Sequence, residues 1–302
     1  MKKTLQAVKN LRIELRLLRL SFILFCVLLE ALPITVQAQK IEKDIVYAST
    51  DQRDLLLDLY MPEKSNNPYL VIWVHGGAWH SGSKDNPPSF FLQLGYAVAS
   101  VDYRLSVEKP FPAMVYDIKA AIRFLRANAD KFGYQDQKII IAGSSAGGHL
   151  AALVGTTSNH QDLEGTLGNH LKVSSSVQLI LDFYGPTNFN SILSQSTPHG
   201  IKVRAPALAL LLGKPVESVP KLAELASPVS HIDATDPPIF IAHGDQDIQV
   251  PVNQSLELNA EYKKLGLNVE LEIVSGAGHS SKQVFTPELI EQVNKFIKRN
   301  LN

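Results

Sequence analysis

The sequence predicts an α/β fold, in which helices flank a doubly wound, mostly parallel sheet. Apolar strand-like runs alternate with helix-like segments through most of the chain, the order that such sheets require. The runs at 69–74 and 97–101 are continuously apolar, as expected of strands that are buried on both faces. With 302 residues, 45% of them hydrophobic and 19% charged, the chain is long enough for one large domain.

The strands and helices can be placed in order along the chain. Leu55, Leu57 and Leu59 alternate with other residues, the period of a half-buried strand, and a turn at 50–53 precedes them. We therefore expect two antiparallel strands at the start of the sheet. In total the sequence predicts strands at 44–49, 54–60, 69–74, 97–101, 138–142, 177–183, 238–243 and 268–274.

Helices are expected between these strands. Pro112 opens a helix whose apolar residues recur on one face, and Gly133 ends it. Further helices are expected after residue 147, over 251–265 and over 287–300. The stretch 190–230 is less regular and predicts a small helical insertion over the site, with short helices near 205–212 and 220–226.

The first 38 residues predict a secretory signal peptide. Their start is basic, residues 20–29 form a ten-residue apolar core, Pro33 breaks it, and residues 36–38 resemble an A-x-A cleavage site. We therefore expect cleavage near Ala38, a catalytic domain at 39–302, and export to the periplasm or the extracellular space without stable membrane insertion. The alternatives are an uncleaved anchor and a lipoprotein site at Cys26, where a bulky phenylalanine precedes the cysteine.

Charge and motif content exclude several classes of function. Lys and Arg together number 29, as do Asp and Glu together, so the formal net charge is zero. No basic block suggests a nucleic-acid partner. Cys26 is the only cysteine, so the predicted mature domain has no disulfide and no thiol nucleophile. The chain lacks zinc, calcium and nucleotide-binding motifs, so no metal and no cofactor is expected.

The pentapeptide Gly143-Ser-Ser-Ala-Gly147 follows an apolar strand and precedes a helix-forming run. In this context G-x-S-x-G is typical of a nucleophile elbow, a sharp turn that leaves the oxygen of Ser145 exposed at the edge of the sheet. The N–H of Ala146 would then point toward a negative oxygen beside Ser145. Because glycine and serine are common, the alternative is an ordinary turn with a surface serine, and the rest of the chain must supply the partners.

The segment His75-Gly-Gly-Ala-Trp79 directly follows a buried strand. A His-Gly-Gly loop in this place can turn the N–H groups of Gly76 and Gly77 toward the elbow and form an oxyanion hole. An ordinary glycine-rich turn is the alternative. His75 itself is expected to have a structural hydrogen-bonding role.

Candidates for the acid and the base follow the last two strands. Asp247 is our choice for the acid, Asp245 competes with it, and a salt-bridged turn aspartate is the alternative. His279 lies on a glycine-rich loop from which it could take the proton of Ser145. The chain order of nucleophile, acid and base is the order found in α/β-hydrolases.

With these residues the chain resembles the esterase/lipase family of α/β-hydrolases, in particular BD-FAE-type enzymes acting on acetylated or feruloylated xylan and hormone-sensitive-lipase-like bacterial esterases. The resemblance extends in order over nearly the whole expected mature domain and includes His75–Trp79, 101–106, 111–114, 117–123, 143–150, 184–187, 226–231, His243–Asp247 and 276–279. It implies the α/β-hydrolase fold. It also implies that Asp102, Tyr103 and Arg104 brace the His-Gly-Gly loop, although a strand end packed against its neighbour remains open. Trp79 would form a substrate-binding wall or, alternatively, a buried anchor.

We therefore expect a secreted serine carboxylic-ester hydrolase that uses an acyl-enzyme, with Ser145, Asp247 and His279 as its triad. Its substrates would be small-molecule or oligosaccharide esters with short acyl groups, such as acetylated or feruloylated xylan fragments. An amide or peptide hydrolase of the same fold, of formamidase or exopeptidase type, is one alternative. A catalytically inactive hydrolase fold used as a binding module is the other.

Overall fold

The computed structural model of the protein describes residues 40–301 apart from 64, 66 and 159. The predicted signal peptide at 1–38, with its cleavage site near Ala38 and Cys26, lies outside the described residues. Within the described part, no helix combines the length and the apolar character needed to cross a membrane.

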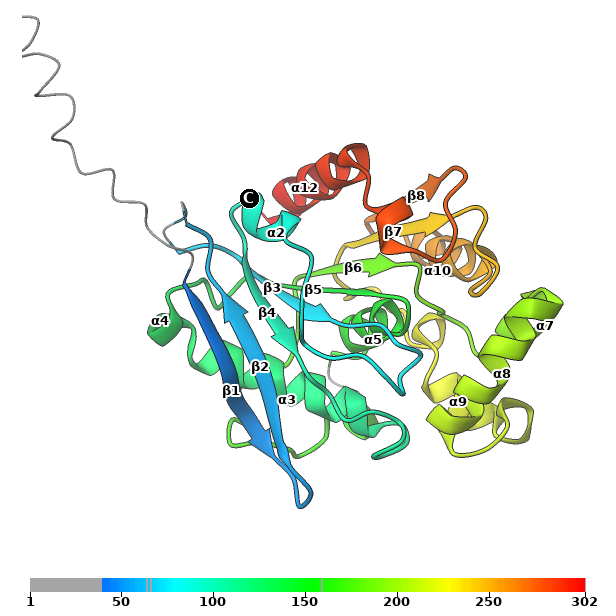
Figure 1. The fold of residues 1–302 in the computed structure, drawn as a ribbon, viewed down its shortest axis with the longest axis horizontal. Helices are drawn as coiled ribbons and strands as arrows, with labels where there is room; N and C mark the ends of the chain where they lie inside the picture. Colours follow the sequence, from blue (N-terminus) through cyan, green and yellow to red (C-terminus); the bar gives the residue numbers. More distant parts are fainter. Residues whose placement is uncertain (1–39, 64, 66, 159, 302) are drawn as a thin grey trace, which may run out of the picture. The chain divides into compact units, whose positions relative to one another are not determined.

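Eight strands form one sheet in the order β1-β2-β4-β3-β5-β6-β7-β8 (Figure 1). The β1–β2 and β2–β4 pairs are antiparallel and all other pairs are parallel, which confirms the predicted sheet. The strands are β1 (Ile41–Ser49), β2 (Asp54–Tyr60), β3 (Leu70–Val74), β4 (Ala97–Val101), β5 (Ile139–Ser144), β6 (Leu179–Phe183), β7 (Ile239–Gly244) and β8 (Val269–Val274).

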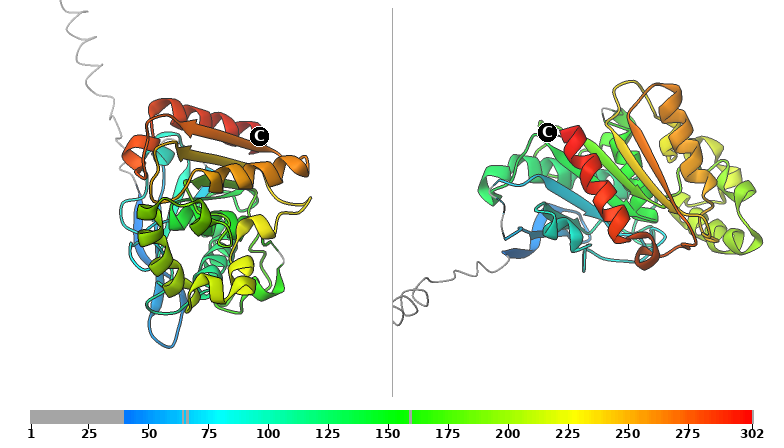
Figure 2. Two further views of the ribbon diagram at one scale, coloured as in Figure 1. Left: turned by 90° about the vertical axis from the view of Figure 1, so that its right-hand side faces the viewer. Right: turned by 90° about the horizontal axis from the view of Figure 1, so that it is seen from above.

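Helices cover both faces of this sheet (Figures 1 and 2). Their bounds are α2 (Phe90–Gln93), α3 (Ala113–Ala127), α4 (Ala129–Phe132), α5 (Ala146–Gly155), α6 (Gln161–Glu164), α7 (Ile192–Gln195), α8 (Pro198–Leu212), α9 (Pro220–Leu225), α10 (Asn253–Lys264), α11 (Ser281–Val284) and α12 (Pro287–Leu301), with 3₁₀ turns at Val216–Ser218 and Pro228–Ser230. Residues of α3, α5 and α10 belong to one apolar core, and residues of α2 and α12 belong to the other.

Strand β3 shows why the sheet needs helices on both faces. Leu70, Ile72 and Val74 pack into the first core, whereas Val71 and Trp73 pack into the second. Since successive side chains of a strand point to opposite faces, an unbroken apolar run can be buried only between two helical layers. The prediction from the continuous apolar runs is therefore confirmed.

The predicted insertion at 190–230, called here the cap segment, contains α7, α8 and α9. The expectation that its first main helix begins near residue 205 is wrong, because α8 begins at Pro198. The hydroxyl oxygen of Thr197 accepts the N–H of Gly200 (3.1 Å) and caps this helix. Pro206 lies inside α8 and hid its first half from the sequence pattern, since proline normally ends or kinks a helix.

Candidate active site

Ser145 lies at the sharp turn between β5 and α5, with φ at 56° and ψ at −121°. A non-glycine residue with this φ is strained and is held in place by its surroundings. A side chain at Gly143 would overlap with the carbonyl group of Gly147, and a side chain at Gly147 would overlap with the carbonyl oxygen of Val74. The two glycines are therefore needed for the turn to pack against β3.

His279 and Asp247 complete a continuous chain of hydrogen bonds with this serine. The Nε2 of His279 lies 2.8 Å from the Oγ of Ser145, and its Nδ1 lies 2.5 Å from the Oδ2 of Asp247. Asp247 follows β7 and His279 follows β8, while Ser145 follows β5. Because these parallel strands end at one edge of the sheet, three residues far apart in the sequence meet there.

The competing acid, Asp245, has a different place. Its carboxylate is exposed and accepts the N–H of Gly276 (2.7 Å) and the hydroxyl of Ser275 (3.2 Å). A further bond joins the N–H of Gln246 to the carbonyl oxygen of Ala277 (2.9 Å). Asp245 thus ties the loop after β7 to the loop after β8, and Asp247 alone of the two contacts His279.

Asp247 is surrounded by donors. Its Oδ1 accepts the N–H groups of Gln249 (2.8 Å) and Val250 (2.9 Å), and its Oδ2 lies 3.3 Å from the Nε2 of His243. Burial raises the pKa of Asp247, but the hydrogen bonds from His243 and His279 outweigh burial and hold this pKa well below its usual range. The carboxylate is therefore ionised and can stabilise an imidazolium at His279.

His243 is a supporting residue that the sequence did not reveal. It is fully buried at the end of β7, where its Nδ1 contacts the Oγ of Ser255 (2.7 Å) and its Nε2 contacts the carbonyl oxygen of Val250 (3.0 Å). These partners place the ring proton on Nε2, so that this nitrogen donates toward Asp247. The signal in the sequence was a histidine at the end of the predicted strand, four residues before the acid in the loop that follows.

The His-Gly-Gly loop lies beside Ser145. Gly76 and Gly77 line the pocket around the serine, and Gly77 has a φ of 111°. A side chain at Gly77 would overlap with the backbone of Ser81, whose N–H donates to the carbonyl oxygen of Gly77 (3.0 Å). Ala146 is the first residue of α5, and N–H groups in the first turn of a helix have no partner within the helix. The geometry thus brings all three expected oxyanion donors next to the serine.

The residues after β4 brace this loop in part. The hydroxyl of Tyr103 donates to the carbonyl oxygen of His75 (3.0 Å), and the two rings stack with centroids 4.4 Å apart. Asp102 accepts the N–H of Lys84 (2.6 Å), farther along the same loop. Arg104 instead pairs with Asp117 (2.6 Å) on α3, so this side chain ties a strand end to a helix.

Trp79 is a buried anchor and does not form a wall of the pocket, so the expectation of a substrate-binding wall needs correction. Its side chain is 0% exposed, and its Nε1–H donates to the Nδ1 of His149 (3.1 Å). It also packs edge-on against Phe189. The positive φ of Trp79 (62°) turns the side chain away from the pocket and into the core.

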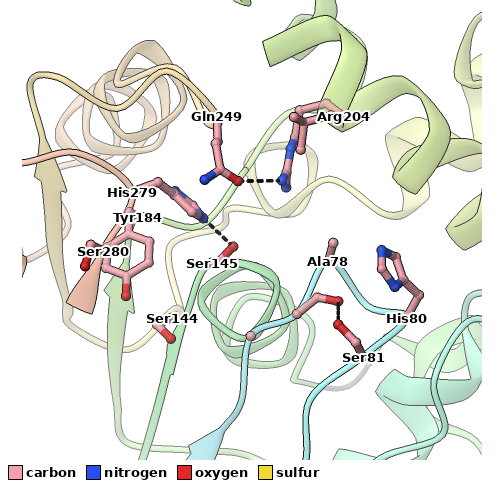
Figure 3. Close-up of a pocket in the computed structure, with 13 residues that line it drawn as sticks. Ala78, His80, Ser81, Ser144, Ser145, Tyr184, Arg204, Gln249, His279 and Ser280 are labelled. Carbon is pink, nitrogen blue, oxygen red and sulfur yellow. Dashed lines mark hydrogen bonds between the residues drawn. The ribbon is translucent and has the colours of Figure 1, made fainter. Parts of the chain in front are cut away.

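The pocket above Ser145 has a volume of about 530 Å³ (Figure 3). One wall consists of residues that follow the strands, and another is formed by Val203 and Arg204 of α8. Sequence reasoning placed the cap segment over the site but singled out neither of these two residues. The lining residues are Gly76, Gly77, Ala78, His80, Ser81, Ser144, Ser145, Tyr184, Val203, Arg204, Gln249, His279 and Ser280.

The fold and this arrangement define an α/β-hydrolase. Residues 57–262 match the model of the BD-FAE family, and the chain belongs to that family. The predicted relationship to α/β-hydrolase esterases is confirmed. The predicted enzyme class, carboxylic ester hydrolase, is confirmed at the level of the family.

Several known proteins are similar to this chain in sequence or structure. The chain is 32% identical to esterase LipC of Mycobacterium tuberculosis, over 62% of this chain and 46% of the relative. It is 30% identical to the isoprenylcysteine alpha-carbonyl methylesterase ICME of Arabidopsis thaliana, over 80% of this chain and 57% of the relative. It thus spans about half the length of the curated relatives that it matches. A truncated carbohydrate esterase from gut microbiota superposes with a TM-score of 0.79 at 30% identity, covering 89% of this chain and 98% of that one.

Proposed function

We propose that this chain is an exported serine carboxylic-ester hydrolase that acts on short-acyl esters of small molecules or oligosaccharides. The observation that carries the proposal is the unbroken hydrogen-bond chain from Asp247 through His279 to Ser145 at the floor of the pocket. A serine is a weak nucleophile by itself, and a histidine oriented by a buried carboxylate activates it.

In the first half of the reaction, the Oγ of Ser145 attacks the carbonyl carbon of the ester while His279 takes the serine proton on Nε2. The negative oxygen of the tetrahedral intermediate would be bound by the N–H groups of Gly76, Gly77 and Ala146. The intermediate collapses, the bond to the alcohol oxygen breaks, and His279 returns the proton to the departing alcohol. An acyl group then remains on Ser145.

In the second half, water attacks the acyl-enzyme and gives its proton to His279. Collapse of the second intermediate breaks the bond to Ser145, which regains the proton, and the acid is released. Asp247 keeps its negative charge throughout and stabilises the imidazolium in both halves. Its low pKa is consistent with this constant charge.

The lining of the pocket supports a short acyl group. Val203 is the one aliphatic side chain larger than alanine among the lining residues, whereas a long acyl chain would need a more extensive apolar surface. The neighbour described as a carbohydrate esterase supports a sugar or oligosaccharide as the alcohol. Export would place the enzyme where such esters occur, and an N-terminus at Gln39 in the secreted protein is the expected outcome of peptide sequencing.

The proposal is tested with a panel of acetyl, butyryl, feruloyl and long-chain esters and acetylated xylan, beside formamide and aminopeptidase substrates. We expect turnover of acetyl and butyryl esters and of acetylated xylan. Cleavage of amides without any preference for esters would instead identify an amide or peptide hydrolase.

A serine-directed phosphonate provides the second measurement. It should label Ser145, and the label should be lost in Ser145→Ala but retained in the matched variant Ser144→Ala, which removes the neighbouring hydroxyl. A wild-type protein that resists labelling and turns over no substrate would identify a binding module.

A further inference from the structure

Arg204 is a buried cation at the mouth of the candidate active site. It lies on α8, is 2% exposed, and lines the pocket above Ser145. In Figure 3 its guanidinium end extends from the helix toward Gln249 and the space above the serine. Its Nε and Nη1 have no hydrogen-bond partner among the described residues, and its Nη2 makes only a long contact of 3.5 Å with the Oε1 of Gln249.

The other buried cations in the described part of the chain are paired with carboxylates. Lys84 contacts Asp58 at 2.8 Å, Lys119 contacts Glu164 at 3.0 Å, and Arg123 contacts Glu164 at 2.5 Å. Arg204 has no such ion pair among the described residues. A charged group removed from water is strongly destabilising unless something compensates it, so this exception calls for an explanation.

The carboxylate of the triad does not provide that compensation. Burial lowers the pKa of Arg204, and the charge of Asp247 opposes this effect. However, both oxygens of Asp247 are occupied by His243, His279 and two backbone N–H groups. The N–H groups of Arg204 thus remain available to another acceptor.

The surroundings hold this side chain in place over the pocket. Gly200, one turn before Arg204, packs so closely on the loop that carries Asp247 that an added Cβ would meet the carbonyl oxygen of Ile248 at 3.0 Å. Near the other end of α8, the carbonyl oxygen of Leu211 accepts the N–H of Phe111 (2.8 Å). Both ends of the helix are therefore held against loops of the hydrolase domain, and this fixes the part of α8 that carries Arg204 beside the pocket.

A carboxylate is the acceptor that fits this guanidinium best. Arginine binds carboxylates through two parallel N–H···O bonds, using either Nε with Nη2 or Nη1 with Nη2. Nε and Nη1 are unpaired but closed to solvent, so a small shift of the side chain is needed before either edge can bind. Such a shift costs little, because the one contact found among the described residues, that of Nη2 with Gln249, is long and weak. A neutral sugar hydroxyl would satisfy one N–H group but would leave the buried charge uncompensated.

We propose that Arg204 binds a carboxylate carried by the ester substrate, so that this enzyme prefers acidic esters. The inference rests on the proposed function and specifies its substrate class. The carboxylate can belong to the alcohol, as in an acyl ester of a uronic acid, or to the acyl group, as in a half-ester of a dicarboxylic acid. The contact with Gln249, on the loop of Asp247 beside His279, favours the alcohol, since His279 protonates the departing alcohol.

The test compares charged and neutral substrates of similar size. On the alcohol side, these are para-acetoxybenzoate and para-acetoxybenzamide. On the acyl side, they are the para-nitrophenyl half-ester of succinate and para-nitrophenyl butyrate, and the spontaneous cleavage of the half-ester by its own carboxylate is measured without enzyme and subtracted. We expect Arg204→Met to lower kcat/KM for the charged member of one pair by about 10- to 100-fold, the range for hydrogen bonds to charged groups, while the neutral member changes little. The affected pair identifies the side on which the carboxylate lies.

Lys202→Met is the matched control, because Lys202 lies on the same helix but is exposed. It should leave the ratio of charged to neutral substrate unchanged, which excludes a general effect of helix charge. Arg204→Lys should retain part of the preference, since lysine keeps the charge but cannot make the two parallel N–H···O bonds of a guanidinium. An equal loss for charged and neutral substrates in Arg204→Met, or an unchanged ratio, would overturn the inference.

A binding measurement separates this inference from the proposed function. Ser145→Ala cannot turn over ester, and calorimetric titration of it with para-acetoxybenzoate and para-acetoxybenzamide reports binding alone. The acid should bind more tightly than the amide, and the added Arg204→Met change should abolish this difference. If the wild type hydrolyses neither ester, the proposed function fails, and the titration still decides whether Arg204 binds a carboxylate; equal affinities would reject it.

Discussion

The two walls of the pocket differ in how they are built. The sheet-end wall consists of Gly76, Gly77, Ser145 and His279, each within a few residues of a strand end. The cap wall consists of Val203 and Arg204 on α8, a helix outside the sheet. In the proposed function, residues on the first wall carry out bond making and breaking, whereas the second wall presents a charge to the rest of the substrate. The proposal thus assigns reaction chemistry and substrate preference to different parts of the fold.

The largest expected effect concerns Asp247, which orients His279 of the sheet-end wall. Asp247→Asn should lower kcat by about 10⁴-fold on every ester, because an amide donates to His279 and stabilises the wrong tautomer. Asp245→Asn, in the neighbouring aspartate of the same loop, should lower kcat by less than about tenfold. Steady-state kinetics on one short ester measures both. The assignment of the acid is reversed if Asp245→Asn proves the more damaging.

The next effect concerns the oxyanion loop. Gly77→Ala should lower kcat by about 10²- to 10³-fold, because the added Cβ displaces the loop and misplaces an N–H donor. Gly95→Ala is the control, since Gly95 also has a positive φ (90°) but has nothing within 4 Å of the added atom. It should strain the backbone comparably and leave kcat unchanged. Equal losses in both variants would show that strain alone, and not donor position, explains the result.

A third prediction concerns the buried carboxyl of Asp182 at the end of β6. Its Oδ1 accepts the N–H of Gly185 (2.9 Å), and burial raises the pKa of Asp182 to about 6. Between about pH 4 and the folded pKa, the native state binds the proton that the unfolded state releases, so stability falls as the pH rises through this window. Asp182→Asn should therefore stabilise the protein by up to about 3 kcal/mol above the folded pKa.

Urea unfolding of the wild type and Asp182→Asn at about pH 4 and pH 7.5 measures this difference. The gain should nearly vanish at the lower pH, where the wild-type carboxyl is protonated in the native state. The same gain at both pH values would mean that the effect does not arise from ionisation of Asp182.

The smallest expected effect concerns Trp79, which belongs to neither wall. Trp79→Phe removes the N–H that satisfies His149 and should lower the free energy of unfolding by about 2 kcal/mol. Because Trp79 is buried away from the pocket, kcat/KM on short esters should change little. A raised KM with an unchanged free energy of unfolding would contradict this prediction and indicate that Trp79 contacts the substrate.

The sequence was most informative for the sheet-end wall. Ser145, Asp247 and His279 follow strands that can be recognised from their apolar runs, and parallel strands end at a common edge. The mutual positions of these residues therefore follow from topology, without knowledge of side-chain packing. For the same reason, every strand of the sheet could be placed within a few residues of its position.

The cap wall and the supporting residues were harder to predict because they depend on packing between segments far apart in the sequence. Arg204 became notable only when the fold showed it buried without a carboxylate. Pro206, two residues later, concealed the first half of the helix, which carries Arg204. Trp79 resembled a pocket residue by its place after the glycines, but its backbone conformation turns it toward His149. Such side-chain orientations are set by tertiary contacts, and no periodic pattern in the sequence indicates them.

The backbone contacts between the loops after β7 and β8 have a consequence for how activity is lost. A side chain at Gly244 would overlap with the carbonyl group of Ala277, and Asp245 binds the N–H of Gly276, so the two loops move together. Among the described residues, β8 is one of the two edge strands and pairs only with β7, whereas Ser145 lies near the middle of the sheet. Fraying of this edge removes acid and base in one event while the serine remains folded. Thermal inactivation should therefore precede global unfolding, and amide hydrogens of β8 should exchange at the rate at which activity is lost.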